Sequence, residues 1–237
     1  MNLFRTLSLA VAGAVALSSS VAFADAIALD SSSVGQTVTL GYNGMADGTT
    51  ITGLTGSTTL TLTGITGTSY NFNYTVTNTT SDPLSSRISS FGFDANPEIA
   101  SATSTGTYDN AVVGGQAPAP YKKVDVCFTS GVSSTCSGGG GVIDGQTGSG
   151  TLTLSFASAP TSLTLSDFFV RYQSITGAGS VTSATGAGTI TSSGGSTGGT
   201  PVPEPGMIGL FGLGLIGLAM ARRRQAPRGR MPHLAAA

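Results

Sequence analysis

Apolar and polar residues alternate along much of the chain between residues 25 and 191. The clearest alternating segments are Thr58–Thr63, Tyr70–Thr77, Val124–Phe128, Leu152–Phe156, Leu163–Leu165 and Asp167–Gln173. A period of two places one face of a segment in a core and the other in water. The Thr, Val, Tyr and Phe residues of these segments also favour extended backbone. The pattern therefore predicts β-strands.

Turn-forming residues separate the alternating segments, as in Asn78–Pro83 and Asp94–Pro97, and no stretch of this region keeps a period of 3.6. Short strands with frequent turns are typical of antiparallel β-sandwiches. The sequence predicts an all-β ectodomain over residues 25–191, an antiparallel β-sandwich of jelly-roll-like form. The Gly/Ser/Thr-rich residues 192–202 predict a flexible linker.

The first 24 residues have the pattern of a secretory signal peptide. Arg5 precedes an apolar run over Leu7–Leu17, and small residues stand at Ala22 and Ala24. The pattern predicts a signal helix that signal peptidase removes before Asp25. The alternative is a plain membrane anchor, but the apolar run is shorter than the ~20 residues that a spanning helix needs.

The second apolar run, Met207–Ala221, is free of charge and predicts a short transmembrane helix. At 1.5 Å per residue it would be about 23 Å long, and long arginine side chains can extend it toward the interface. The arginines Arg222, Arg223 and Arg224 follow directly and favour a cytoplasmic end. Residues 225–237 are then a basic cytoplasmic tail.

Charge is scarce and unevenly distributed. Charged residues make up 9% of the chain, against about 25% in ordinary soluble domains. Between Asp25 and Val202 there are ten acidic and four basic residues, a formal charge of −6. Such a domain repels phosphate backbones, so the sequence argues against a nucleic-acid partner.

Cys127 and Cys136 are the two cysteines of the chain, nine positions apart with a turn-like Thr-Ser-Gly between them. In an oxidising compartment such a pair predicts a disulfide that closes a hairpin. The alternative is a catalytic thiol, which needs a neighbouring base. The only histidine, His233, lies in the C-terminal tail.

The lack of histidine in the exported part also argues against Ser-His-Asp chemistry and against zinc held by histidine. Asp94, Asn96 and Glu98 alternate and could offer oxygen ligands to calcium, although turn residues account for the same letters. Asp94 and Glu98 could also form a glycosidase pair. We expect no cofactor and no catalytic residue.

Sugar-binding sites commonly present flat aromatic rings, and the chain has no tryptophan. Tyr70, Tyr74 and Tyr172 fall on faces expected in the core. Tyr42, Tyr108 and Tyr121 fall near turns and are the better surface candidates. Asn73 and Asn78 each begin an Asn-X-Thr sequon.

The segment before the second apolar run carries a family resemblance. Val202, Pro203, Glu204, Pro205 and Gly206 precede the apolar run and the arginine cluster, and the two prolines keep the chain extended there. This order over residues 203–224 resembles the PEP-CTERM sorting signal of Gram-negative bacteria. The resemblance implies processing by an intramembrane exosortase in cells that often make exopolysaccharide.

The phrases "YNFNYTVTNTTSDP", "SRISSFGFDANP", "VDVCFTSGVSSTC" and "DFFVRYQSI" also resemble the cistern family of PEP-CTERM proteins, which brings no activity with it. The sequence thus predicts a non-enzymatic protein, anchored in the inner membrane as a precursor and then sent to the cell surface or extracellular matrix. The alternatives are an exopolysaccharide-binding module and, third, a carboxylate-dependent glycan hydrolase.

Overall fold

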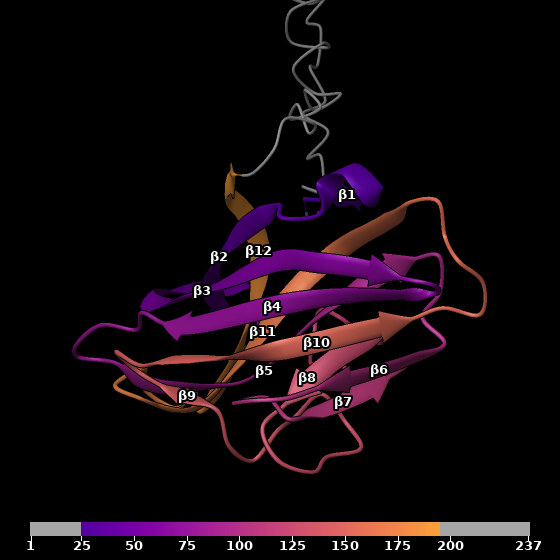
Figure 1. The fold of residues 1–237 in the computed structure, drawn as a ribbon. Coiled ribbons are helices and arrows are strands. Elements are labelled where there is room, and N and C mark those ends of the chain that lie inside the picture. Colours follow the sequence, from indigo (N-terminus) through magenta and orange to yellow (C-terminus); the bar gives the residue numbers. More distant parts are fainter. Residues whose placement is uncertain (1–24, 195–237) are drawn as a thin grey trace, which may run out of the picture. The chain divides into compact units, whose positions relative to one another are not determined.

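The computed structural model describes residues 25–194, which form an antiparallel β domain (Figure 1). Its elements follow one another along the chain: β1 (Ile27–Leu29), the 3-10 turn η1 (Ser31–Ser33), β2 (Thr37–Ala46), β3 (Thr49–Thr66), β4 (Ser69–Asn78), β5 (Ser85–Asn96), β6 (Ser101–Ser104), β7 (Asn110–Val113), β8 (Val126–Thr129), β9 (Val142–Ile143), β10 (Thr147–Ser155), β11 (Leu163–Thr176) and β12 (Ser183–Gly194). The all-β class is confirmed.

All these strands belong to one sheet, in the order β6-β10-β4-β3-β2-β12-β11-β5-β8-β7, with β1 on β11 and β9 on β5. The sheet curls until its end strands β6 and β7 lie close together. The prediction of a sandwich, which implies two separate sheets, is therefore not confirmed. Residue alternation reports which face of a strand is buried, and a curled single sheet buries its inner face just as a sandwich does.

Irregularities in the strand ladders accompany the curl. The pairings of β2 with β3, β3 with β4, β11 with β5 and β12 with β2 all contain register shifts. Such bulges bend a strand and increase its twist. They allow strands as long as the 18-residue β3 to follow a strongly curved surface.

The main core fills the inside of the curl. The alternating residues predicted to face inward do so, for example Leu60 and Leu62 in β3 and Phe72 and Tyr74 in β4. At its centre, the rings of Tyr74, Phe91 and Tyr108 are in contact, with centroids 5.2 to 6.0 Å apart. Each predicted strand segment lies in or overlaps an observed strand, and the two segments over 163–173 are parts of the single strand β11.

Strand β5 does not alternate, because both of its faces are covered. Ser89, Ser90, Phe91, Gly92 and Phe93 are all buried. On the outer face a second cluster forms from Val124, Cys127, Cys136 and Phe169, with Tyr121 packed against it. β5 also extends to Asn96, so the turn predicted at Asp94–Pro97 begins later than expected.

The predicted boundary between ectodomain and linker falls inside β12. Ser192, Ser193 and Gly194 pair with residues 37–39 of β2. Ladder pairing uses backbone groups, which Gly and Ser supply when a neighbouring strand is present. Among residues 25–194 we find no helix with the length and apolar character needed to span a bilayer. The predicted signal helix and transmembrane helix lie outside the described residues.

Candidate functional site

The sorting residues predicted from the sequence lie outside the described part of the chain. These are Val202, Pro203, Glu204, Pro205, Gly206, Arg222, Arg223 and Arg224, together with Ala22 and Ala24 of the signal cleavage site. Asp25, the residue after the predicted cleavage, is described, and its carboxylate accepts a hydrogen bond from the backbone N–H of Ile190 in β12. The start of the domain is thus fixed to the strand that ends it.

The predicted disulfide between Cys127 and Cys136 is present, and both residues are buried. The sequence predicts that this disulfide closes a hairpin. In the structure it does not join two paired strands. Cys127 lies in β8, whose neighbours are β5 and β7, whereas Cys136 lies in the loop after β8. The backbone N–H of Cys136 donates to Gln116 O at 3.1 Å. The bridge therefore holds this loop against the outer face of the sheet.

Ser90 connects the same loop to β5. Its hydroxyl donates to the carbonyl oxygen of Cys136 at 2.6 Å. A Cβ on Gly115 would lie 2.7 Å from the Cys136 sulfur, so only glycine leaves room for the bridge there. The cysteines have a packing role, and within residues 25–194 no histidine stands near them.

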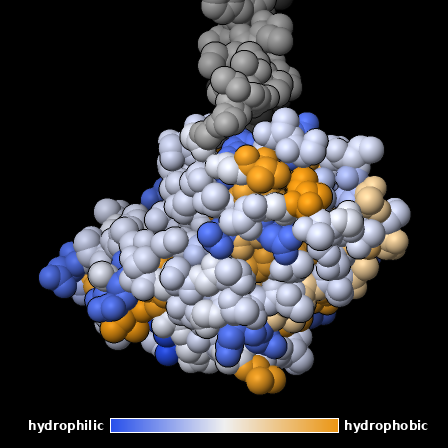
Figure 2. All heavy atoms as spheres, viewed as in Figure 1, coloured by the Kyte–Doolittle hydropathy of each residue, from blue (hydrophilic) through white to orange (hydrophobic). Residues whose placement is uncertain are grey.

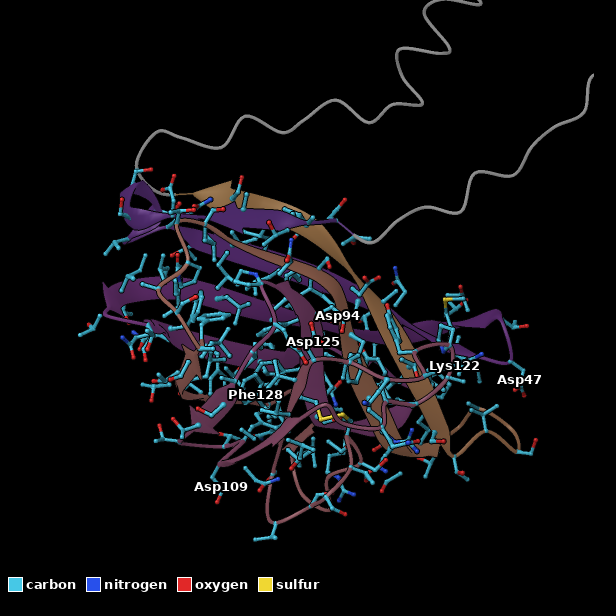
Figure 3. The ribbon with its side chains drawn as sticks, turned by 90° about the vertical axis from the view of Figure 1, so that its right-hand side faces the viewer. Asp47, Asp94, Asp109, Lys122, Asp125 and Phe128 are labelled. Carbon is cyan, nitrogen blue, oxygen red and sulfur yellow. A yellow bond between two sulfur atoms is a disulfide. The ribbon has the colours of Figure 1, made fainter. Side chains whose placement is uncertain are left out.

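The side chains of Asp94 and Asp125, which lie close together (Figure 3), each accept a backbone hydrogen bond at the point where the β5–β8 ladder ends. The N–H of Asp125 donates to the Asp94 carboxylate at 2.9 Å, and the N–H of Ala95 donates to the Asp125 carboxylate at 2.8 Å. Burial raises the pKa of Asp94, and the charges of Asp125 and Asp167 add to this, while the hydrogen bond from Asp125 opposes it. Beyond the last backbone pair of the ladder, hydrogen bonds from backbone N–H groups to these two carboxylates thus hold the two segments together.

The calcium candidates Asp94, Asn96 and Glu98 do not form a ligand set. Asp94 and Glu98 line the same hollow, together with Lys123 and Asp125, while Asn96 is not part of its lining. Within residues 25–194 no three His, Cys, Asp or Glu side chains lie close enough to hold a metal ion. The Asp94 carboxylate is used as a backbone acceptor, a structural role.

The tyrosines differ in part from expectation. Tyr70, Tyr74 and Tyr172 are buried as predicted. Tyr42 and Tyr108, expected at the surface, are also buried, because β2 packs on the core and the Tyr108 hydroxyl donates to Ile88 O at 2.8 Å.

Tyr121 remains partly exposed. Burial, with the charges of Asp167 and Asp94, raises its pKa to about 12. Its hydroxyl donates to Phe168 O at 3.2 Å. It does not belong to a surface group of tyrosines.

The two sequons have different environments. Asn73 is exposed on β4, but Asn78 is buried. The Asn78 side-chain amide donates to Ser86 O and Val142 O at 3.2 and 3.1 Å. Asn78 is therefore inaccessible to modification in the folded domain.

The outer surface of β2, β3, β4 and β10 carries a regular array that the sequence analysis missed. We call it the hydroxyl face and define it as the odd-numbered residues of four ranges: 37–43, 55–63, 71–77 and 147–153. All of these are Thr, Ser or Asn except Gly41, and none is buried. In Figure 2, the surface over β3, β4 and β10 is mostly pale, as expected for residues of intermediate hydropathy.

The strand register places these side chains in rows across the sheet. One row joins Thr39, Thr59, Thr75 and Ser149, each opposite the next. Neighbours in a row are about 4.7–4.9 Å apart across strands, and alternate residues of one strand are about 6.7 Å apart. Hydrogen bonds join the hydroxyls of Thr37 and Thr61 (2.9 Å), Thr39 and Thr59 (3.0 Å), and Thr77 and Thr147 (3.0 Å).

The hydroxyl face contains no charge. Of the strands in residues 25–194, only β5 and β11 contain Asp, Glu, Lys or Arg, and the other charged residues of this region lie outside the strands. The alternation of Thr with apolar residues in β3 and β4 was visible in the sequence. Its continuation across four strands depends on the register.

These features define a disulfide-containing all-β domain with an uncharged, hydroxyl-rich outer face. Residues 201–224 match the family model described as the PEP-CTERM protein-sorting motif. No curated protein and no solved structure is significantly similar to the chain. The protein carries a PEP-CTERM sorting signal, as the sequence predicted, and this motif implies export, a membrane-anchored precursor and processing by an exosortase-like enzyme.

Proposed function

We propose that this protein is a non-enzymatic protein of the cell surface or extracellular matrix of a Gram-negative bacterium. Signal peptidase cleaves its precursor between Ala24 and Asp25. The helix over 207–221 then holds the precursor in the inner membrane until an exosortase-like enzyme removes it. The observation that carries the proposal is the sorting motif at residues 201–224.

Two features of the domain support a structural role over a catalytic one. The exported part contains no histidine, and the Asp94 and Asp125 carboxylates bond to backbone N–H groups. A disulfide and a large core suit a domain that must persist outside the cell. Membership of the cistern family belongs to the same proposal.

Mass spectrometry of the mature protein tests it. We expect an N-terminus at Asp25 and a C-terminus upstream of Met207, in material recovered from the cell surface or medium. An intact C-terminal segment on protein that remains in the inner membrane would contradict the proposal. Retention in the cytoplasm would contradict it as well.

A second candidate function is exopolysaccharide binding. The uncharged hydroxyl face favours it, because neutral sugars are recognised through hydroxyl and amide groups. A third is glycan hydrolysis by Asp94 and Glu98, which line one hollow. Measurable turnover of purified exopolysaccharide that an Asp94→Asn or Glu98→Gln variant abolishes would favour the third candidate over the first.

A further inference from the structure

The hydroxyl face is unusual in what it lacks. Exposed sheets in water normally carry charged side chains, which keep proteins soluble and prevent association. Within the four defined ranges, the adjacent strands present only Thr, Ser, Asn and Gly41 outward, although the domain has fourteen charged residues elsewhere. Beyond these ranges, β2 exposes Met45, and Ile51 and Ile65 of β3 are partly exposed. Depletion of charge also occurs at the core of protein–protein interfaces.

The face is also preorganised. Threonine is branched at Cβ and has few χ1 rotamers, and the cross-strand hydrogen bonds fix the hydroxyls further, for example between Thr39 and Thr59. Each bonded pair of threonines keeps one O–H donor and several lone pairs for an external partner. Little side-chain entropy is lost when such groups bind a ligand.

The composition of the face restricts its occupant. Anionic polymers require cations, and the face has none. A bilayer or an apolar protein surface requires large apolar side chains, which the face lacks. A neutral partner that is rich in hydroxyl groups fits both restrictions.

The shape restricts the occupant further. The core lies inside the curled sheet, so the hydroxyl face is the convex side of a twisted surface. Two convex faces touch only along a narrow strip, whereas a stable interface buries roughly 800 Å² per partner, so this shape disfavours a second copy of the chain. A flat crystalline surface would also contact a convex face over only a small area. A linear polymer, in contrast, can follow a convex, twisted face and contact more of it.

We propose that the hydroxyl face binds an extended, neutral polysaccharide through the rows of Thr, Ser and Asn centred on Thr39, Thr59 and Thr75. The inference rests on the proposed function, since an exported protein meets such polymers in the matrix. Because the face has no outward aromatic ring, each sugar contributes little. Affinity comes from many sugars of one chain bound at once.

The test is affinity electrophoresis of the mature, processed protein through gels that contain hydroxyethyl cellulose, galactomannan or dextran, with polygalacturonate as the anionic comparison. We expect at least one neutral polymer to slow migration, equally at low and high salt. The variant Thr39→Val/Thr59→Val/Thr75→Val removes hydroxyls and keeps branched strand-formers. It should bind about tenfold more weakly or worse.

Thr75→Lys is a second variant that preserves solubility, and we expect the same loss. Thr182→Lys is the matched control, because Thr182 is exposed in the turn between β11 and β12, and it should bind like the parent. Circular dichroism verifies that all variants fold.

Three results would overturn the inference: no retardation by any neutral polymer, retardation by polygalacturonate alone, or equal retardation of the parent and both hydroxyl-face variants. A change of solution mass in Thr75→Lys would assign the face to a second copy of the chain. None of these results affects the proposed function, whose readout is the termini and location of the mature protein.

Discussion

Asn78 ends β4, and its side chain joins three segments of the domain. The amide donates to Ser86 at the start of β5 and to Val142 in β9, and its oxygen accepts from the N–H of Thr80 at 3.1 Å. All of these groups lie in the interior, where an unpaired polar atom costs about 1–3 kcal/mol. A single side chain therefore holds β4, β5 and β9 together.

We expect Asn78→Ala to lower the free energy of unfolding by about 2–4 kcal/mol, because the Val142 carbonyl and the Thr80 N–H lose the Asn78 side chain as a partner, and the Ser86 carbonyl keeps its bond from Asp144 N–H. Urea denaturation measures this. Asn73→Ala, at an exposed position of the same strand, should change stability by about 0.5 kcal/mol or less. Equal effects of the two substitutions would show that the Asn78 bonds contribute nothing.

Asp94 gives a residue-scale prediction about pH. Its pKa is raised in the folded domain, first by burial and then by Asp125 and Asp167. The folded state thus holds the proton more tightly than the unfolded state, so stability falls as pH rises through the window above the ordinary aspartate pKa of 3.8. At neutral pH, the ionised Asp94 carboxylate therefore lowers the free energy of unfolding.

Asp94→Asn should therefore be at least as stable as the parent at pH 7, because an amide oxygen still accepts from Asp125 N–H and carries no charge. The advantage should disappear in acid, below the window, where the parent carboxyl is itself protonated. Urea denaturation across this pH range measures the difference. A variant that is less stable than the parent at pH 7 would show that the charge itself is needed there.

At the scale of elements, the disulfide is the covalent link between the loop after β8 and the sheet. Cys127 and Cys136 are nine residues apart, and closing a loop of this size stabilises by about 2–3 kcal/mol in the loop-entropy model. The loop also covers β5, through Ser90 and the cluster around Phe169. If this loop detaches from the sheet, the outer face of the central strand β5 becomes exposed.

The Cys127→Ala/Cys136→Ala variant should lose about 2–3 kcal/mol of unfolding free energy, and the segment 130–141 should become the first site of proteolysis. Denaturation with limited proteolysis measures both, and the reduced parent should resemble the variant. An oxidised parent cut in this segment as quickly as the variant would argue that the bridge does not hold the loop.

At the scale of the whole molecule, membrane anchoring and recognition by the processing enzyme are expected to depend on different segments of the C-terminal region. The apolar run over 207–221 and Arg222–Arg224 have the composition of a membrane anchor. Pro203, Glu204 and Pro205 belong to the matched sorting motif, and we expect them to be dispensable for anchoring.

Changing Pro203, Glu204 and Pro205 to alanine should leave the precursor in the membrane and make it accumulate unprocessed. Cell fractionation and the size of the mature band measure this. Alanine at Ser196, Thr197 and Thr200 is the matched control and should be processed normally. Deleting Arg222–Arg224 should instead weaken retention. A tripeptide variant that is released like the parent would reduce Pro-Glu-Pro to a spacer.

Local pattern was sufficient wherever one face of a strand meets water. The strands around Leu60, Phe72 and Leu154 were predicted from alternation, since alternation directly reflects one buried face. The Cys127–Cys136 pair followed from there being only two cysteines. The sorting motif followed because it is a short linear signal recognised by residue order.

The tertiary structure decided what depends on partners distant in the chain. The sequence of β5 does not alternate, so periodicity did not predict this strand; its outer face is covered by the loop of residues 130–141. Tyr108 is buried because its hydroxyl bonds to Ile88 O across the core. The number of sheets depended on pairing that periodicity does not specify. The hydroxyl face depends on strand register, which places residues distant in sequence opposite each other, for example Thr77 and Thr147, seventy residues apart. Register across a sheet is set by long-range packing of the core.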